Sequence, residues 1–176
     1  ISPAGLRCAA EVADGVFPMM LDPEKFDVAY LPYLEEGFAA AGNGKSLANF
    51  AVVPGVSVIV TDEPEKARMA VKGGMALYIG GMGARGKNFY NDLAKRLGYE
   101  AAAVRIQDLF LAGKKLEAAA AVPDELLDAV HLIGSADRIR GRLAAWKEAG
   151  RKGWVHTMQI ATAQPAALEL LAEELL

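Results

Sequence analysis

The alternation of apolar segments with strong helix starts is the feature that most constrains the fold of this chain. Three segments are predicted as strands: the almost wholly apolar Gly15–Leu21, the valine-rich Phe50–Val60 and the alternating Trp154–Thr162. Within the second of these, Pro54-Gly55 predicts a bulge, because proline cannot donate a hydrogen bond to a neighbouring strand.

Helix starts flank these segments. Ser2-Pro3 and Asp22-Pro23 each place a capping residue before a proline, and the acidic run Asp62–Glu65 suits the positive end of a helix. Further helical sequence is predicted over residues 88–127, 135–149 and 165–176. Strand followed by helix, several times over, predicts an α/β protein with a parallel sheet. The stretch between Thr61 and Trp154 is long for one crossover and predicts an inserted helical region.

The amino-acid composition excludes several classes of protein and of binding partner. The 176 residues, 53% hydrophobic and 23% charged, predict one globular domain over 1–176. A net charge of −3 argues against nucleic acid and anionic membranes as partners, because both select basic surfaces. The longest apolar run, Phe50–Val60, is about half of the roughly 20 residues that span a bilayer. The lone Cys8 excludes an internal disulfide and a cysteine-rich zinc site, which suits a cytoplasmic protein.

One glycine motif matches a known fingerprint. Residues 81–86 read Gly-Met-Gly-Ala-Arg-Gly, the G-x-G-x-x-G pattern of dinucleotide-binding loops. That interpretation needs Met75–Gly80 to be a strand and Asp108 to bind a ribose. The alternatives are a helix that continues through Met75–Gly80 into a glycine-rich loop, or a mobile loop whose Arg85 and Lys87 meet an anion. The motif alone is a weak signal.

Other candidate residues are sparse. His131 lies near the end of a predicted helix and His156 lies on the last predicted strand. Neither has a carboxylate or cysteine at metal-ligand spacing, so no metal site is predicted. No catalytic residue is identified from the residues alone.

The order of motifs resembles the luciferase-like monooxygenase superfamily. The resemblance rests on the opening segment through Ala13-Asp14-Gly15, on Ala76–Gly83 with Lys87–Tyr90, and on Ile133-Gly134-Ser135 with the helix and strand that follow. The middle segment is similar to the branch of coenzyme F420-dependent oxidoreductases, which includes methylene-tetrahydromethanopterin reductases.

The resemblance implies a (β/α)8 barrel, which takes about 250 residues. The three predicted strands, with Ile1 at the end of another, would be the last four of eight. The resemblance therefore implies that this chain supplies about the C-terminal half, and that the N-terminal half of the barrel is its partner. The start at Ile1, without an initiator methionine, fits processing or an upstream segment.

The resemblance also implies where ligands bind. Barrel enzymes bind them at the carboxyl ends of the strands, here Ile1-Ser2, Met19–Asp22, Thr61-Asp62 and Ala161–Gln164. The cofactor's phosphate end is expected at Ser2, Pro3, Ala4 and Gly5, where a helix start offers backbone N–H groups. Gly80–Asn88 is expected to be a lid or substrate loop, with Gly81, Met82, Arg85 and Asn88 as its candidate residues. Catalytic residues are expected in the N-terminal half.

The function implied is hydride transfer between the deazaflavin coenzyme F420 and a small organic substrate, by an enzyme that forms a homodimer. Three alternatives remain: an FMN-dependent two-component monooxygenase on the same fold, a non-catalytic half-barrel module, and an NAD(P)-binding Rossmann protein that uses Gly81–Gly86.

Overall fold

The computed structural model describes residues 1–176, which form two compact units. The helical unit comprises Ile1–Ser2 and Glu65–Asp128, and the sheet unit comprises Pro3–Pro64 and Ala129–Leu176. All strands belong to the sheet unit. A helical region is therefore confirmed within the stretch predicted between Thr61 and Trp154, but it is shorter than predicted, because residues from Ala129 onward belong to the sheet unit. No helix is long and apolar enough to cross a membrane.

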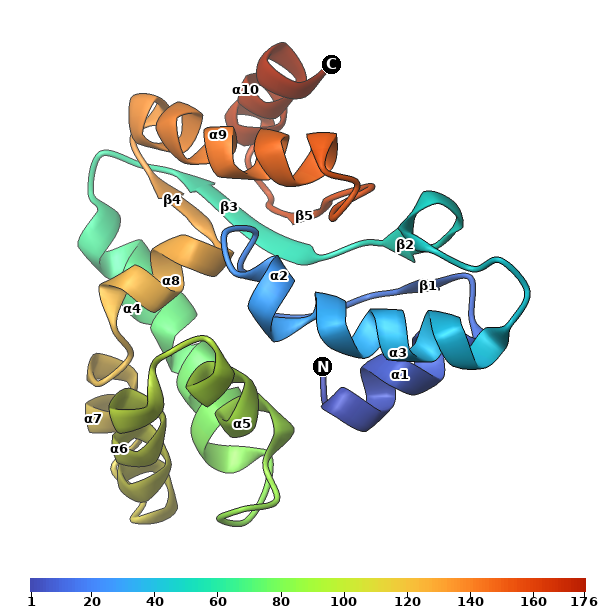
Figure 1. The fold of residues 1–176 in the computed structure, drawn as a ribbon. Helices are drawn as coiled ribbons and strands as arrows, with labels where there is room; N and C mark the ends of the chain where they lie inside the picture. Colours follow the sequence, from blue (N-terminus) through green and yellow to red (C-terminus); the bar gives the residue numbers. More distant parts are fainter. The chain divides into compact units, whose positions relative to one another are not determined.

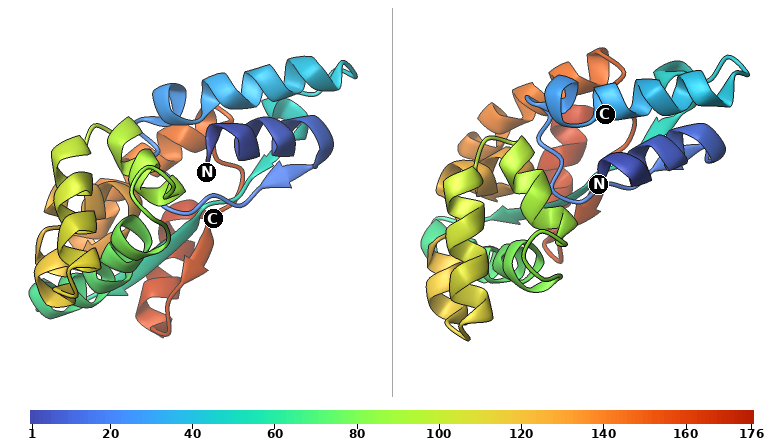
Figure 2. Two further views of the ribbon diagram at one scale, coloured as in Figure 1. Left: turned by 90° about the horizontal axis from the view of Figure 1, so that it is seen from below. Right: turned by 60° about the horizontal axis from the view of Figure 1, so that its bottom comes forward.

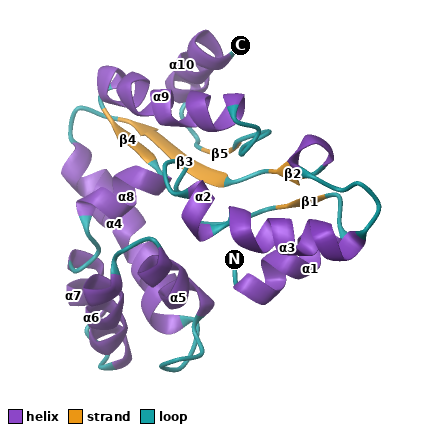
Figure 3. Cartoon of the chain, in the orientation of Figure 1, coloured by secondary structure: helices purple, strands orange, loops and turns teal.

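The sheet unit contains the strands and the helices that cover them (Figures 1 and 3). Its strands are β1 (Gly15–Val16), β2 (Ala51–Val52), β3 (Gly55–Val60), β4 (Leu132–Gly134) and β5 (Gln159–Ala161). Its helices are α1 (Pro3–Val12), α2 (Phe26–Ala29), α3 (Leu31–Ala41), the short η1 (Leu47–Asn49), α9 (Ala136–Arg151) and α10 (Pro165–Leu175). All strand pairs are parallel, in the orders β1-β2 and β4-β3-β5.

The helical unit follows β3 along the chain. It contains α4 (Pro64–Ala76) from Glu65 onward, the π-helical turn η2 (Leu77–Gly81), α5 (Phe89–Arg96), α6 (Glu100–Leu111), α7 (Lys115–Ala120) and most of α8 (Asp124–Val130). Arg68 of α4 is buried and pairs with Asp128, with a shortest nitrogen–oxygen distance of 2.6 Å, and with Asp124 at 2.8 Å. This ion-pair cluster joins the first helix of the unit to the last.

The strand predictions were right in position but too long. Gly15–Leu21 contains only the two-residue β1, and Trp154–Thr162 contains only the three residues of β5. Phe50–Val60 is divided into β2 and β3 by Val53-Pro54, which confirms an interruption at the proline. The sequence interpretation missed β4, which lies against β3 with Leu132 opposite Val58.

The core of the sheet unit lies between the strands and α9. Val56 and Val58 of β3 are fully buried, and so are Ile139 and Leu143 of α9. Figure 1 shows α9 along the β4-β3-β5 sheet with α10 beside it, and Figure 2 shows α1 alongside α3. Gly37 of α3 allows α1 and α3 to pack closely, because a Cβ there would lie 2.3 Å from the Arg7 carbonyl oxygen of α1.

Each histidine bonds the backbone of one of two consecutive strands, His156 to β2 and His131 to β3. The Nδ1 atom of His156 accepts a hydrogen bond from the Val52 N–H at 3.3 Å, and that of His131 accepts one from the Ser57 N–H at 3.1 Å. Burial lowers the pKa of His131 from 6.5 to about 4, because an imidazolium there would lose its hydration. The neutral ring is the form that accepts the bond at Nδ1.

The folded protein is therefore expected to lose stability in mild acid. Because the unfolded chain protonates His131 below about pH 6.5 and the folded chain only near pH 4, the contribution is complete above that window and is lost as the pH falls through it. The loss is at most about 3 kcal/mol. We expect His131→Asn, which keeps an acceptor near the Nδ1 position, to flatten the unfolding free energy between pH 7 and pH 4 in denaturant titrations. His156→Asn is the control, and an unchanged pH slope in His131→Asn would contradict the assignment.

Candidate functional site

The carboxyl ends of the parallel strands form the edge at which ligands bind in α/β proteins. In the sheet unit this edge consists of the segment after β1, Thr61 after β3, Ser135 after β4 and Thr162–Gln164 after β5. Hydrogen bonds join neighbouring strand ends at this edge. Gln164 accepts a hydrogen bond from the Val60 N–H at 2.8 Å and donates one to the Val60 carbonyl at 3.2 Å, and the Thr61 N–H donates to the Gly134 carbonyl at 2.9 Å.

The segment after β1 is held in an unusual conformation. Met20 has a φ of 57°, the only positive value among the non-glycine residues, and its carbonyl accepts a hydrogen bond from the Tyr30 hydroxyl at 2.8 Å. Such strain persists only where surrounding contacts enforce it, and it concentrates at functional sites. Asp22 follows directly and is only 2% exposed.

Asp22 is the buried carboxyl group of this edge. Its Oδ1 accepts a hydrogen bond from the Glu24 N–H at 2.9 Å. Burial raises the pKa of Asp22, and the hydrogen bond from Glu24 and the charges of Lys25 and Arg142 oppose that rise. The resemblance placed Met19–Asp22 at a strand end, and Asp22 does follow β1 in the structure. The helix start predicted at Asp22-Pro23 is wrong, because Pro23 and Glu24 form a turn and α2 begins at Phe26.

The predicted cofactor residues lie at the start of α1. The helix begins at Pro3, as its cap-and-proline sequence predicts, with Ser2 directly before it in the chain. Ala4 and Gly5 in the first turn are exposed. First-turn N–H groups have no partner within their own helix and carry positive potential, so this end is suited to an anion. The roles of Ser2, Pro3, Ala4 and Gly5 stay predictions.

The glycine motif does not lie in a dinucleotide-binding loop. Met75 and Ala76 end α4, and Leu77–Gly81 continue it as the π-helical η2. No strand leads directly into the glycines, because α4 and η2 separate them from β3. The Rossmann interpretation is therefore wrong, and the alternative of a continuing helix is confirmed. Asp108 binds Arg85, with nitrogen–oxygen distances of 2.7 and 2.9 Å. Both side chains of that pair are exposed.

Close packing explains two glycines of the motif. A Cβ on Gly81 would lie 2.4 Å from the ring of Phe110 in α6, and one on Gly83 would lie 2.3 Å from the Lys87 carbonyl oxygen. Gly86 has a φ of 73°, where glycine is favoured. Met82 is 54% exposed at the start of the loop.

Asn88 ends the loop as a buried capping residue. Its Oδ1 accepts from the N–H groups of Tyr90 and Asn91 at the start of α5, at 3.0 and 3.2 Å. Its amide nitrogen donates to the carbonyls of Tyr78 and Ile79 in η2, at 2.9 and 3.0 Å. Both ends of the side chain thus fix the loop between η2 and α5. The substrate or lid roles of Gly81, Met82, Arg85 and Asn88 stay predictions, and Arg85 is the exposed cation among them.

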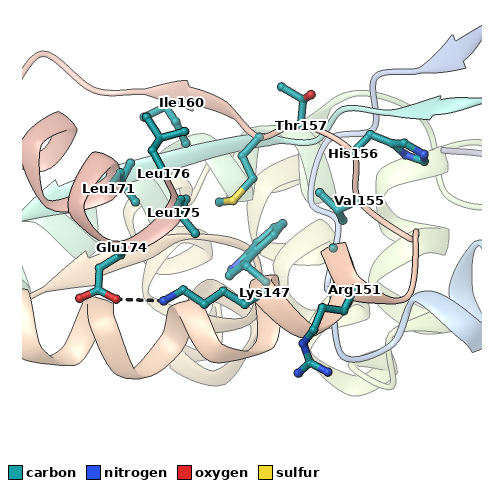
Figure 4. Close-up of a pocket in the computed structure, with 13 residues that line it drawn as sticks. Lys147, Arg151, Val155, His156, Thr157, Ile160, Leu171, Glu174, Leu175 and Leu176 are labelled. Carbon is teal, nitrogen blue, oxygen red and sulfur yellow. Dashed lines mark hydrogen bonds and ion pairs between the residues drawn. The ribbon is translucent and has the colours of Figure 1, made fainter.

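A separate groove in the sheet unit lies away from the carboxyl edge. It measures about 850 Å³ and is lined by α9, α10 and the residues that lead into β5 (Figure 4). Lys147 at its rim is paired with Glu174 at 2.9 Å, and Arg151 and His156 point away from it in Figure 4. Because Val155–Met158 precede β5, this groove borders the opposite, amino end of that strand.

A family model described as luciferase-like monooxygenase matches residues 1–153 of this sequence. The chain belongs to this family. It is 37% identical over 164 residues to a Mycobacterium tuberculosis protein named "Putative coenzyme F420-dependent oxidoreductase Rv3520c", covering 93% of this chain and 46% of that protein. The expected family is thereby confirmed.

Two solved structures show the luciferase-like fold. The coenzyme F420-dependent tetrahydromethanopterin reductase of Methanopyrus kandleri matches with a TM-score of 0.67 at 24% identity, covering 98% of this chain and 47% of that one. An F420-dependent secondary alcohol dehydrogenase in complex with an F420-acetone adduct matches with a TM-score of 0.62 at 15% identity, covering 99% and 46%. The expected fold class, the (β/α)8 barrel of the luciferase type, is confirmed. The chain spans about half the length of these relatives.

The glycine motif of this luciferase-like chain gives a direct test of its structural role. Gly83→Ala forces a methyl group against the Lys87 carbonyl, and we expect it to lower the free energy of unfolding by about 1–3 kcal/mol. The control is Gly73→Ala in α4, where nothing lies within 4 Å and alanine should stabilise the helix by up to about 1 kcal/mol. Urea titrations measure both, and equal stabilities for the two variants would contradict the packing explanation.

Proposed function

We propose that this chain is part of an F420-dependent oxidoreductase that transfers a hydride between the deazaflavin and a small organic substrate. The observation that carries the proposal is the 37% identity, over 93% of the chain, to a relative named as an F420-dependent oxidoreductase. Two F420-dependent enzymes share its fold. The remaining strands of the barrel would be supplied by residues outside this sequence, and the working enzyme would be a homodimer.

The first turn of α1 would hold the phosphate end of the cofactor. Ala4 and Gly5 are exposed residues of the first turn, where the backbone N–H groups of a helix suit an oxyanion, and Ser2 directly before them carries a hydroxyl. Pro3 contributes no N–H but fixes the direction in which the helix begins. When bound, F420 supplies the hydride chemistry at its deazaflavin ring.

The rest of the carboxyl edge would position the ring. Gln164 locks the end of β5 to Val60, and the strained Met20 places Asp22 at the end of β1. In the helical unit, Gly81–Asn88 would act as a substrate loop, with Met82 offering an apolar contact and Arg85 an anion contact. An anionic substrate would have to compete with Asp108 for the Arg85 guanidinium.

Spectral titration of the complete enzyme with F420 and with FMN tests the proposal. We expect saturable binding of F420 and turnover that does not consume oxygen, because a deazaflavin does not readily activate oxygen. The printed description of the family as monooxygenases favours the second candidate, FMN with oxygen. FMN binding with oxygen-dependent turnover and no F420 binding would replace the first proposal with the second. Binding of neither cofactor would favour a non-catalytic half-barrel module.

A matched pair of substitutions tests the phosphate site. Ala4 in α1 and Ala166 in α10 are both exposed and both follow a proline at the helix start. Glutamate at either position should stabilise its helix by about 0.3–1 kcal/mol through the helix dipole. Only Ala4→Glu places a carboxylate where the cofactor phosphate would bind, so we expect it to weaken F420 binding about tenfold, or 1.4 kcal/mol. Equal F420 affinities for the two variants would remove this end of α1 from the site.

A further inference from the structure

An apolar groove lies within the helical unit. It measures about 660 Å³, which is in the range of small-molecule sites, roughly 300–1,000 Å³. Its apolar lining includes Met69 of α4, Leu77 of η2, Phe110 of α6 and Leu116 of α7, and Leu116 is 83% exposed. All the lining residues belong to the helical unit itself. Apolar side chains gathered at one depression are typical of a surface that binds another molecule.

The only polar side chains in the lining of the groove are those of Lys66 and Lys115. Neither is paired with a carboxylate, whereas Lys72, on the same helix as Lys66, is paired with Asp124 at 2.7 Å. The Nζ atom of Lys115 lies 5.8 Å from the centre of the Phe110 ring, so this cation lies beside the apolar lining. An ammonium group next to an apolar surface attracts an anion, and the attraction strengthens when water is displaced.

The two lysines restrict the chemistry of an occupant. A purely apolar molecule would gain nothing from the ammonium groups and would displace part of their water, which costs free energy. A cation would be repelled by both. Nucleic acid and anionic membranes select wide basic surfaces, which two lysines in a chain of net charge −3 do not provide. A molecule with an apolar body and one anionic end complements both parts of the lining.

The spacing along α4 and η2 suggests the length of that apolar body. Met69, Gly73 and Leu77 are four residues apart, so they lie in one row along the helix surface, about 12 Å long. Lys66 is three residues before Met69 and therefore lies at one end of this row. An extended alkyl chain advances roughly 1.25 Å per carbon, so about ten carbons cover the row.

We propose that this groove binds a straight-chain aliphatic carboxylate of about ten carbons. The chain would lie along the row from Met69 to Leu77, and the carboxylate would lie beside Lys66 and Lys115. The site uses none of the residues assigned to the cofactor or to the substrate loop, so it stands independently of the proposed function.

Three ligands with the same alkyl chain and different end groups test the charge requirement. Isothermal titration calorimetry is carried out on the complete protein, so that any segment able to cover the groove is present, with decanoate, decanol and decyltrimethylammonium below their micelle concentrations. We expect saturable binding of decanoate and at least tenfold weaker binding of the other two. Equal affinities for the three ligands would overturn the proposal. Absence of saturable decanoate binding would also overturn it, and would mean that another occupant covers the groove.

Matched substitutions locate the binding site. Gly73→Leu fills the middle of the row, whereas Gly74→Leu has equally open space but does not line the groove. We expect decanoate binding at least tenfold weaker in Gly73→Leu and unchanged in Gly74→Leu. Combining Lys66→Gln with Lys115→Gln should remove the preference for decanoate over decanol, whereas Lys114→Gln, outside the groove, should keep it. Equal effects of the two leucines, or a preference that survives the loss of both groove lysines, would contradict the assignment.

Discussion

The hydrogen-bonding groups of the segment from Val52 to Val60 are the constraint on which the sheet unit depends. This segment is central and apolar, and Val52, Val56 and Val58 are fully buried, so its N–H and C=O groups need partners within the protein. The three neighbouring strands are short, and β5 and β4 each pair with only half of β3. Side chains supply what the short strands do not: His156 bonds Val52, His131 bonds Ser57, and Gln164 bonds both backbone groups of Val60.

These side chains also connect the strands to the site. Because Gln164 follows β5 and holds the end of β3, the same bonds that satisfy the central strand set the spacing of the carboxyl edge. The bond to β3 also needs a neutral His131. Burial disfavours the imidazolium and leaves Nδ1 as an acceptor for the Ser57 N–H. A change that loosens the central strand would therefore be expected to disturb ligand binding as well as stability.

Local signals in the sequence predicted the helices well and the strands less well. The starts of α1 and α4 follow from capping residues and prolines that act within one turn, and the structure places both helices where predicted. The three residues of β4, in contrast, become a strand only through their pairing with β3, more than 70 residues earlier. The roles of Gln164 and His131 depend on equally distant backbone groups. A short stretch of sequence therefore cannot show which distant backbone groups these residues will bond.

The glycines of the helical unit show why a motif alone could not decide the function. Gly81 and Gly83 are required by neighbours at close range, Phe110 and Lys87, and Gly86 by its positive φ. The same three glycines could bind a pyrophosphate if a strand led directly into them. Only the helical backbone of Met75–Gly81 distinguishes the two cases. Gly73 and Gly74 of α4 meet neither requirement, since they lie in a helix and no atom lies within 4 Å of where their Cβ atoms would be. The role of a glycine therefore follows from the backbone conformation and from the atoms near its Cβ position, and neither of these can be read from the glycine letters alone.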